Sequence, residues 1–423
     1  MIKGRKVSAF AGVAAAAVLL AGCGGAGDQP STGGTIKFSG QTQEQKLWEP
    51  LFKAFEDANP GYKVDATFTP NDSYPQLIQT QLQAGQAADV IQSTPGSGGG
   101  LAALTLAQGG RLATLTDASW AKSLPKTTMP LVTMDSKVYA YPTDLAPFFV
   151  AYNPDLFTRA GVKVPTTFNE LLNACTAIAN AGLTPIALAG KSFQNVNITL
   201  QSLAANNVYG PVPDWNQQRA DGKTTFAASA EWKKVLSDFK KMIDARCYSP
   251  DVAGVAAPVH SQQFASSKAA MYVMPAQALS IVAGSAPPDL KVSSFAFPGD
   301  SKDTTWVSGT SGISLVVNAK ARNLDGAKKL LEFLGLPEQR IAYAKHAGTI
   351  AYGAGSNGSD VIPEALEPLR PYLESDKALT LNYLSWPTAA VSQQLATSAQ
   401  GLLTGQKTID QVLADTDQAW GKK

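Results

Sequence analysis

The chain has little of the side-chain chemistry that metal centres and nucleophilic enzymes need. Its 423 residues include two histidines and three cysteines. His260 and His346 lie far apart in the sequence, and neither stands in a cluster with cysteine or acidic residues. A His-rich metal site and a histidine-based triad are therefore poorly supported. We expect no metal, no cofactor and no catalytic residue, and we place both histidines at the surface or in turns.

Charge is also scarce. Charged residues make up 16% of the chain, against about a quarter in typical domains. The 35 lysines and arginines nearly balance the 33 acidic residues, and no basic run appears, so nucleic acid is not an expected partner. Arginine is scattered, which counts against a strongly anionic ligand. The glycine-rich run 96–100 lacks the Lys-Ser/Thr ending of a phosphate-binding loop, so we interpret it as a turn of close backbone approach.

Only one long apolar run stands out, and it lies at the N-terminus. Residues 7–20 are too few for a free transmembrane helix, which needs about 20 apolar residues. Three basic residues precede the run, so residues 1–22 are interpreted as a signal peptide. The run closes on Leu20-Ala21-Gly22-Cys23, which resembles the lipobox of bacterial lipoproteins. The resemblance implies that Cys23 is acylated and anchors the protein to the outer face of the cytoplasmic membrane.

The segment that follows Cys23 fits a membrane tether. Residues 23–34 are rich in glycine and contain serine and proline, a composition typical of a flexible linker. Two or more acyl chains on Cys23 give stable anchoring. The alternative is an ordinary cleaved signal peptide followed by a chance cysteine.

Two further cysteines, Cys175 and Cys247, remain. Cys175 lies on the apolar face of one predicted helix, and Cys247 follows the end of another. A location outside the cytoplasm permits a disulfide. We favour pairing, and two separate buried thiols are the alternative.

The rest of the chain favours an α/β fold with two lobes. About 390 residues follow the tether, which is more than one hydrophobic core normally holds. Strand-like and helix-like segments alternate, beginning with a strand at residues 35–38. Thr167–Glu170 and Thr408–Gln411 have the spacing of capping boxes that start helices. Residues 232–243 carry the strongest amphipathic helical face.

Several short motifs follow one another in an informative order. The most specific block is Tyr141-Pro142-Thr143-Asp144 with Tyr152-Asn153-Pro154-Asp155-Leu156-Phe157 after it. Further blocks are residues 55–64, 88–91, 110–117, 165–171, 264–271, 311–314, 337–339 and 402–408. Together they resemble the extracellular solute-binding proteins of ABC importers, specifically the carbohydrate-binding group similar to maltose-binding protein. One departure is that Pro275 and Gln277 stand where the family often has glycine and then an aromatic residue.

The resemblance implies two α/β lobes of the periplasmic-binding-protein type II fold, joined by crossing strands, with the ligand in the cleft between them. We expect the N-terminal lobe to comprise residues 35–147 and 308–346. The C-terminal lobe is expected to comprise residues 148–307 and 347–423.

The resemblance also implies a function. The chain is expected to capture a mono- or oligosaccharide and deliver it to permease subunits whose cytoplasmic ATPase drives import. It is expected to act as a monomer and not as an enzyme.

Polar residues that follow the strands of the expected N-terminal lobe are the first candidates for ligand contact, because open α/β sheets bind ligands at the carboxyl ends of their strands. Gln41, Gln43 and Glu44 follow the first strand, although they could serve only as a helix N-cap. Ser93 and Thr94 follow the third strand. Asp144 precedes the expected lobe crossing, where its carboxylate can accept two hydrogen bonds from a sugar or can instead cap the hinge.

A sugar site also needs a flat aromatic surface. Trp306, in a polar loop just before Gly309, and Trp386, before a proline, are the best stacking candidates, with simple packing as the alternative. Phe193, Asn195 and Gln277 are expected to line the opposing lobe.

Three other readings stay open. An extracellular glycosidase needs two carboxylates across the cleft, and no spacing in the sequence specifies such a pair. The same fold could bind a polyol, a glycerophosphodiester, a peptide or a metal chelate. A structural surface protein or adhesin is the third alternative.

Overall fold

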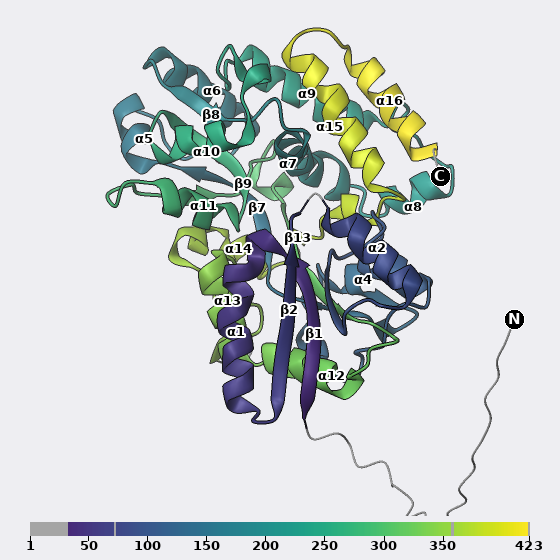
Figure 1. The fold of residues 1–423 in the computed structure, drawn as a ribbon. Coiled ribbons are helices and arrows are strands. Elements are labelled where there is room, and N and C mark those ends of the chain that lie inside the picture. Colours follow the sequence, from purple (N-terminus) through teal and green to yellow (C-terminus); the bar gives the residue numbers. More distant parts are fainter. Residues whose placement is uncertain (1–32, 72, 357–358, 422–423) are drawn as a thin grey trace, which may run out of the picture.

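The protein is built on two β-sheets, each with its own layers of helices (Figure 1). The computed structural model describes residues 33–71, 73–356 and 359–421. The predicted signal peptide, Cys23 and nearly all of the tether lie outside the described residues. The first strand begins at Gly34, one residue before its expected start at residue 35.

The first sheet has the strand order β2-β1-β3-β12-β6. Strands β1, β2 and β3 run parallel, and β12 is antiparallel to both β3 and β6. The strands are β1 Gly34–Gln41, β2 Tyr62–Thr69, β3 Val90–Ser93, β6 Ala140–Pro142 and β12 Ser314–Val317. The helices of this part are α1 Gln45–Ala58, α2 Tyr74–Ala84, α3 Ala103–Gln108, α4 Met129–Val132, α12 Leu324–Leu334 and α13 Pro337–Ala347. We call this part the N-lobe.

The second sheet has the order β13-β11-β7-β9-β8, and β10 also pairs with β7. Its strands are β7 Ala146–Tyr152, β8 Thr184–Ala187, β9 Ala269–Pro275, β10 Ser293–Phe295, β11 Val307–Thr310 and β13 Ala378–Leu379. Its helices are α5 Pro154–Ala160, α6 Phe168–Asn180, α7 Phe193–Ala204, α8 Trp215–Ala220, α9 Ala230–Asp244, α10 Ala257–Ala265, α11 Ala278–Ser285, α14 Arg370–Leu373, α15 Ala389–Leu403 and α16 Ile409–Gly421. We call this part the C-lobe.

Short 3-10 and irregular segments and one small hairpin complete the structure. They are η1 Thr42–Glu44, η2 Ser119–Ser123, the π-helical η3 Ala205–Tyr209, η4 Val252–Gly254, η5 Lys302–Thr304, η7 Glu364–Leu369, η8 Asn382–Ser385, β4 Thr133–Met134 and β5 Lys137–Val138.

The chain passes between the lobes at three neighbouring places. The first crossing joins β6 to β7, and the second joins β11 to β12. At the third, the backbones of Leu145 and Ile350 exchange two hydrogen bonds of 2.9 and 3.0 Å. Because β7 and β11 pair with each other, residues 146–147 and 308–310 belong to the second sheet, a few residues away from the expected lobe limits.

Each lobe has its own aromatic-rich core. In the N-lobe, Trp48 and Phe52 of α1 pack against Phe38 of β1, and Phe55 of α1 packs against Tyr62 of β2. In the C-lobe, Trp215, Trp232 and Trp386 meet around Phe226. Burying such large side chains stabilises each lobe, since each is worth about 1.5–3 kcal/mol or more.

The local signals in the sequence appear where they were expected. Thr408 and Gln411 form a reciprocal capping box at the start of α16. At the start of α6, Thr167 accepts a hydrogen bond from the Glu170 amide, whereas the Glu170 carboxylate accepts from the amide of Thr166 at 2.7 Å, so the predicted box forms only in part. Cys175 of α6 and Cys247 after α9 form a disulfide, which links these two helices of the C-lobe.

One expectation about the histidines is wrong. His346 is exposed, but His260 is buried and its Nε2 atom lies 2.7 Å from the Tyr272 hydroxyl. Burial lowers the pKa of His260. Its position in a short helix gave no sign of this partner, which comes from a strand of the second sheet.

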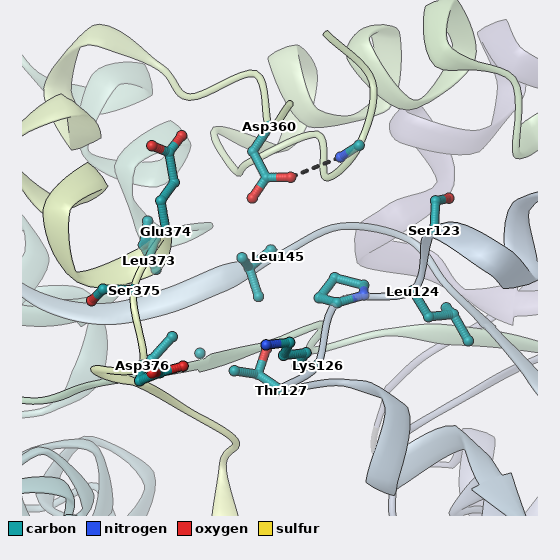
Figure 2. Close-up of a pocket in the computed structure, with 14 residues that line it drawn as sticks. Ser123, Leu124, Lys126, Thr127, Leu145, Asp360, Leu373, Glu374, Ser375 and Asp376 are labelled. Atoms are coloured by element: carbon teal, nitrogen blue, oxygen red, sulfur yellow. Dashed lines mark hydrogen bonds between the residues drawn. The ribbon is translucent and has the colours of Figure 1, made fainter. Parts of the chain in front are cut away.

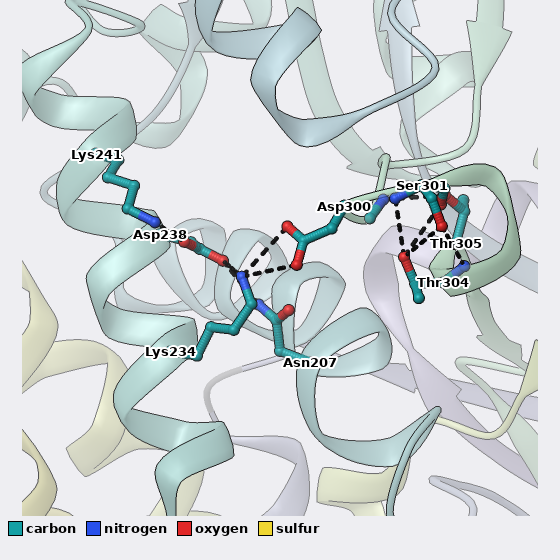
Figure 3. A network of polar contacts seen from close by, with 9 residues as sticks. Asn207, Lys234, Asp238, Lys241, Asp300, Ser301, Thr304 and Thr305 are labelled. Carbon is teal, nitrogen blue, oxygen red and sulfur yellow. Dashed lines mark hydrogen bonds and ion pairs between the residues drawn. The ribbon is translucent and has the colours of Figure 1, made fainter.

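A charged network ties α9 to the loop that precedes β11 (Figure 3). The Asp238 carboxylate is 1% exposed and accepts hydrogen bonds from Lys234 at 2.6 Å and Lys241 at 2.8 Å. Asn207 donates to it at 3.1 Å, and Lys234 also pairs with Asp300 at 3.3 Å. A buried carboxylate is stable only with such partners.

Among the described residues, no helix has both the length and the apolar character needed to span a bilayer. In the same residues, no group of three His, Cys, Asp or Glu side chains has an arrangement suited to a metal ion.

Candidate functional site

The strand directions bring one edge of each sheet to the lobe boundary. In the N-lobe, β1 and β3 end there at Gln41 and Ser93, and the antiparallel β12 begins there at Ser314, opposite Ser93. In the C-lobe, β9 ends there at Pro275, paired with Phe148 near the start of β7. We call this pair of facing edges the cleft edge, and it is where an open α/β sheet holds a ligand.

Amide side chains gather on the N-lobe part of the cleft edge. The side-chain oxygen Oε1 of Gln41 accepts hydrogen bonds from the side chains of Asn71 at 3.3 Å and Gln92 at 3.4 Å. The Oε1 atom of Gln92 in turn accepts from the Gln41 backbone amide at 3.1 Å. Gln41 is half-buried and Gln43 is exposed. These groups are uncharged and can donate as well as accept, which suits the hydroxyls of a neutral ligand.

Glu44 lies beside these amides with one oxygen free. The residue is 6% exposed, and its Oε1 atom accepts a hydrogen bond from Gln43 at 2.7 Å. Its Oε2 atom is buried and has no hydrogen-bond partner in the structure. Burial raises the pKa of Glu44, although the hydrogen bond from Gln43 partly lowers it. A buried acceptor without a partner costs free energy, so this carboxylate would gain a hydrogen bond wherever a ligand hydroxyl reaches it.

The two candidates after β3 differ from each other. Ser93 is buried, and its hydroxyl lies 2.7 Å from the Leu101 carbonyl oxygen, so it holds the following loop in place. Thr94 is exposed and forms an isolated bridge with Ala102. Of the two, only Thr94 presents its side chain to solvent.

Asp144 occupies the hinge, which makes the alternative of a hinge-cap residue the better description. The residue is 5% exposed, and its Oδ1 atom accepts from Ser311 at 2.9 Å and from Thr143 at 3.2 Å. Burial raises the pKa of Asp144 to about 6, and the hydroxyls of Ser311, Thr349 and Thr143 lower it in part. The expected direct contact with a sugar is not supported in this arrangement, because the carboxylate is enclosed by the crossing segments.

The C-lobe candidates are more accessible. Gln277 is exposed at the start of α11. Its side chain lies close to Gly312, because a Cβ atom built on Gly312 would stand 3.3 Å from the Gln277 Nε2 atom. Phe193 and Asn195 are both half-buried at the start of α7. Phe193 packs against the C-lobe core, and the Asn195 side chain donates a hydrogen bond to the Ser192 hydroxyl at 3.0 Å.

Trp306 is half-buried and already has a neighbour on its ring. The Lys377 ammonium lies 4.5 Å from the ring centroid, in the geometry of a cation–π contact. A Cβ at Gly210 would stand within 2.7 Å of the indole, so the absence of a side chain there lets the ring approach closely. Gly309, the candidate nearest to Trp306 in the sequence, pairs with Pro147 across the two hinge strands.

The expected stacking role of Trp386 is wrong for this structure. The side chain is 0% exposed and sits among Phe226, Trp232 and Trp420, with ring centroids 5.4–6.1 Å away. Its Nε1 atom donates to Asn216 at 3.0 Å. A buried ring offers no face to a ligand, so the alternative of simple packing applies.

The structure also contains a cavity that the sequence did not indicate. It has a volume of about 650 Å³ and lies against the hinge strands at Leu145 and Gly309 (Figure 2). Its charged lining residues are Lys126 from the N-lobe and Asp360, Glu374 and Asp376 from the C-lobe. Burial, and then the nearby charge of Glu374, raise the pKa of Asp360, while its hydrogen bond from the Gly353 amide lowers it. Of the candidate residues, Gly309 alone lines this cavity.

Comparison with known proteins adds the decisive observation. Residues 39–341 match the family of bacterial extracellular solute-binding proteins, which is well over half of the chain. The chain belongs to this family. The matched range includes every candidate ligand-binding residue named above except Trp386.

The solute-binding protein has relatives with stated ligands. The multiple sugar-binding protein of Streptococcus mutans is 23% identical over 95% of this chain and 96% of its own length. The diacetylchitobiose binding protein DasA of Streptomyces coelicolor is 25% identical over 82% of this chain and 81% of its own length.

Solved structures share the two-lobe architecture of this solute-binding protein. The apo form of RafE from Streptococcus pneumoniae superimposes with a TM-score of 0.75 at 22% identity, covering 93% of this chain and 98% of that chain. RafE in complex with raffinose gives a TM-score of 0.74 at 20% identity, covering 91% and 98%. At these identities the likeness concerns the fold.

Proposed function

We propose that this solute-binding protein captures a carbohydrate, a mono- or oligosaccharide, at the cleft edge between its lobes and passes it on unchanged. The observation that carries the proposal is the set of uncharged amides at the ends of β1 and β3, together with the free Oε2 atom of Glu44. A sugar hydroxyl can donate to that oxygen while amide groups serve the neighbouring hydroxyls. The named ligands of the relatives, several sugars and diacetylchitobiose, agree with this chemistry.

The cavity in Figure 2 is less suited to a neutral sugar. Its volume is within the usual range of about 300–1,000 Å³ for ligand sites. However, the described residues that line it include three carboxylates and no aromatic or amide side chain. A sugar site uses a ring for stacking and paired donors and acceptors for the hydroxyls. We propose that Phe193, Gln43 and Gln277 supply these groups.

The remaining parts of the proposal concern the setting. Cys23 is acylated after removal of residues 1–22, residues 23–34 serve as the tether, and the protein works as a monomer outside the cytoplasm. Residues 35–145 and 311–346 move as one lobe against residues 146–310 and 347–423, the expected limits being shifted by the pairing of β7 with β11. The loaded form docks on a permease whose cytoplasmic ATPase supplies the energy. The match to an extracellular family supports this setting.

The test is a thermal-shift screen of neutral mono- and oligosaccharides, followed by titration calorimetry of each sugar that raises the melting temperature. A ligand at 100 times its Kd stabilises the folded protein by about 2.7 kcal/mol, which such a screen detects. We expect at least one sugar to bind and to be recovered intact. Release of new reducing ends would instead identify a glycosidase. Binding of a peptide, polyol or phosphodiester, with no binding of a sugar, would show that the ligand belongs to another chemical class.

Two variants decide where the sugar binds. Gln43→Ala and Gln277→Ala alter exposed side chains of the cleft edge, and each should weaken binding by about tenfold through the loss of a hydrogen bond to the ligand. Asp376→Asn in the cavity is the matched control, since it is also exposed. If both glutamine variants bind the sugar as tightly as the parent while Asp376→Asn binds it more weakly, the sugar binds in the cavity and not at the cleft edge.

A further inference from the structure

A single carbonyl group of the C-lobe holds the glycine-rich loop of the N-lobe. The Leu384 oxygen accepts hydrogen bonds from the Ser97 amide at 2.9 Å and from the Gly98 amide at 3.0 Å. Ser97 and Gly98 follow β3 of the first sheet, whereas Leu384 lies in η8, between β13 of the second sheet and α15. These bonds therefore join the two lobes through residues that belong to none of the three crossing segments.

The loop can approach Leu384 because of its glycines. Gly96 has φ +83°, a backbone conformation that favours glycine. A Cβ at Gly96 would stand 2.9 Å from the carbonyl carbon of Leu384, and nearer still to its oxygen. At Gly98 the same atom would stand 3.3 Å from that oxygen. At Gly99 it would meet nothing within 4 Å, so the close contact depends on particular glycines of the run.

The N-lobe holds its half of this contact firmly. The Gly96 amide donates to the Leu131 carbonyl at 2.7 Å, and the Gly96 carbonyl accepts from Leu104 at 2.9 Å. The Thr105 hydroxyl donates to the Ser97 carbonyl at 3.0 Å. The loop is thus fixed to α3 and α4 before it meets the other lobe.

The C-lobe holds the other half through Trp386. Asn216 of α8 accepts from the Trp386 indole and donates to the Asn382 carbonyl at 2.8 Å and to the Ser385 hydroxyl at 2.9 Å. The Tyr209 hydroxyl accepts from the same indole at 3.2 Å. The buried ring therefore anchors η8, so that the Leu384 carbonyl faces the N-lobe at a fixed place.

We propose that the Gly96–Gly98 loop and the Leu384 carbonyl form a latch that holds the two lobes together without help from a ligand. Opening the lobes must break both hydrogen bonds at once, because they share one acceptor. The latch pre-organises the lobe arrangement seen in this structure, and a ligand that binds this arrangement then spends less of its binding free energy on bringing the lobes together. This inference concerns the position of the lobes and does not depend on the identity of the solute.

The first test is small-angle X-ray scattering of the ligand-free protein as parent, Gly96→Ala and Gly99→Ala. We expect a larger radius of gyration for Gly96→Ala, because its Cβ displaces the Leu384 carbonyl. Gly99→Ala should match the parent, since its Cβ enters open space. A folded Gly96→Ala with the parent radius of gyration would overturn the proposal.

A variant on the opposite lobe tests the latch even if Gly96→Ala fails to fold. Asn216→Ala releases η8 without touching the glycines. Hydrogen exchange followed by mass spectrometry should then show faster exchange at the Ser97 and Gly98 amides in ligand-free protein, by about tenfold for a weakened hydrogen bond. If Gly96→Ala does not fold, unchanged exchange of these amides in a folded Asn216→Ala would be the overturning result. Because no ligand is added, failure here leaves the proposed sugar function to its own test.

Discussion

Asp144→Asn should stabilise the protein at neutral and alkaline pH. The carboxylate lies at the hinge, and its described hydrogen bonds come from the hydroxyls of Ser311 and Thr143, without a cation. The substitution keeps the Oδ1 acceptor for these donors. It removes the negative charge that burial disfavours, and the Thr349 hydroxyl lies beside the new amide group.

The magnitude follows from the pKa. Burial raises the pKa of Asp144 from 3.8 to about 6 in the folded protein, so the folded state holds its proton more tightly than the unfolded state. The destabilising contribution is thus absent well below pH 4, grows as the pH rises from about 4 to about 6, and then stays constant. A shift of this size corresponds to about 3 kcal/mol. We therefore expect the gain in unfolding free energy of Asp144→Asn to be about 2 kcal/mol larger at pH 8 than at pH 4.

The assay is urea unfolding of the parent and the variant at both pH values, with Asp376→Asn as the exposed control. Taking the difference between parent and variant removes the titration of the other acids. The control should differ from its parent by less than about 0.5 kcal/mol at either pH. Equal effects of Asp144→Asn at pH 4 and pH 8, or a loss of stability at pH 8, would refute the reasoning.

Three further changes have expected outcomes. Replacing Cys175 and Cys247 by alanine should lower the unfolding free energy by about 4 kcal/mol, because the disulfide closes a separation of 72 residues, and urea unfolding measures this. Trp386→Ala should cost about 3–5 kcal/mol through the cavity it leaves, again by urea unfolding. Lys234→Met should cost about 2 kcal/mol in thermal or urea unfolding, because it removes a charged donor from the buried Asp238 carboxylate.

These expectations have clear contrary results. Two titratable thiols from Cys175 and Cys247 in denatured, non-reduced protein would contradict the disulfide. A Trp386→Ala variant as stable as the parent would mean that the ring does not anchor the C-lobe core. For the charged network, exposed Lys233 is the control. Equal losses of unfolding free energy in Lys233→Met and Lys234→Met would show that the hydrogen bond of Lys234 to the buried Asp238 carboxylate does not stabilise the protein.

The sequence predicted those features that depend on neighbours along the chain. The predicted helix caps Thr167 and Thr408 start helices because their hydroxyls reach amides three residues away. The amphipathic face of residues 232–243 lies in the C-lobe core. The block around Tyr141 marks the first lobe crossing, because β6 ends and β7 begins there.

The rest depended on contacts between distant segments. A tryptophan before a proline has the same local pattern in an exposed loop and in a buried anchor, and only Phe226 and Asn216 reveal which applies to Trp386. Asp144 is enclosed by Ser311, which lies 167 residues away. The cavity at the hinge likewise arises from Lys126 and Asp376 on different lobes, so no sequence motif could indicate it.

The central claim is that the cleft edge holds a neutral, hydroxyl-rich solute without changing it. Titration calorimetry of the parent with the best sugar from the screen, repeated with Gln43→Ala, tests this claim most directly. The account predicts one sugar per chain, recovered intact, and a Kd about tenfold weaker for the variant. Absence of binding by every neutral sugar, while a charged solute binds with the same affinity to parent and Gln43→Ala, would contradict it.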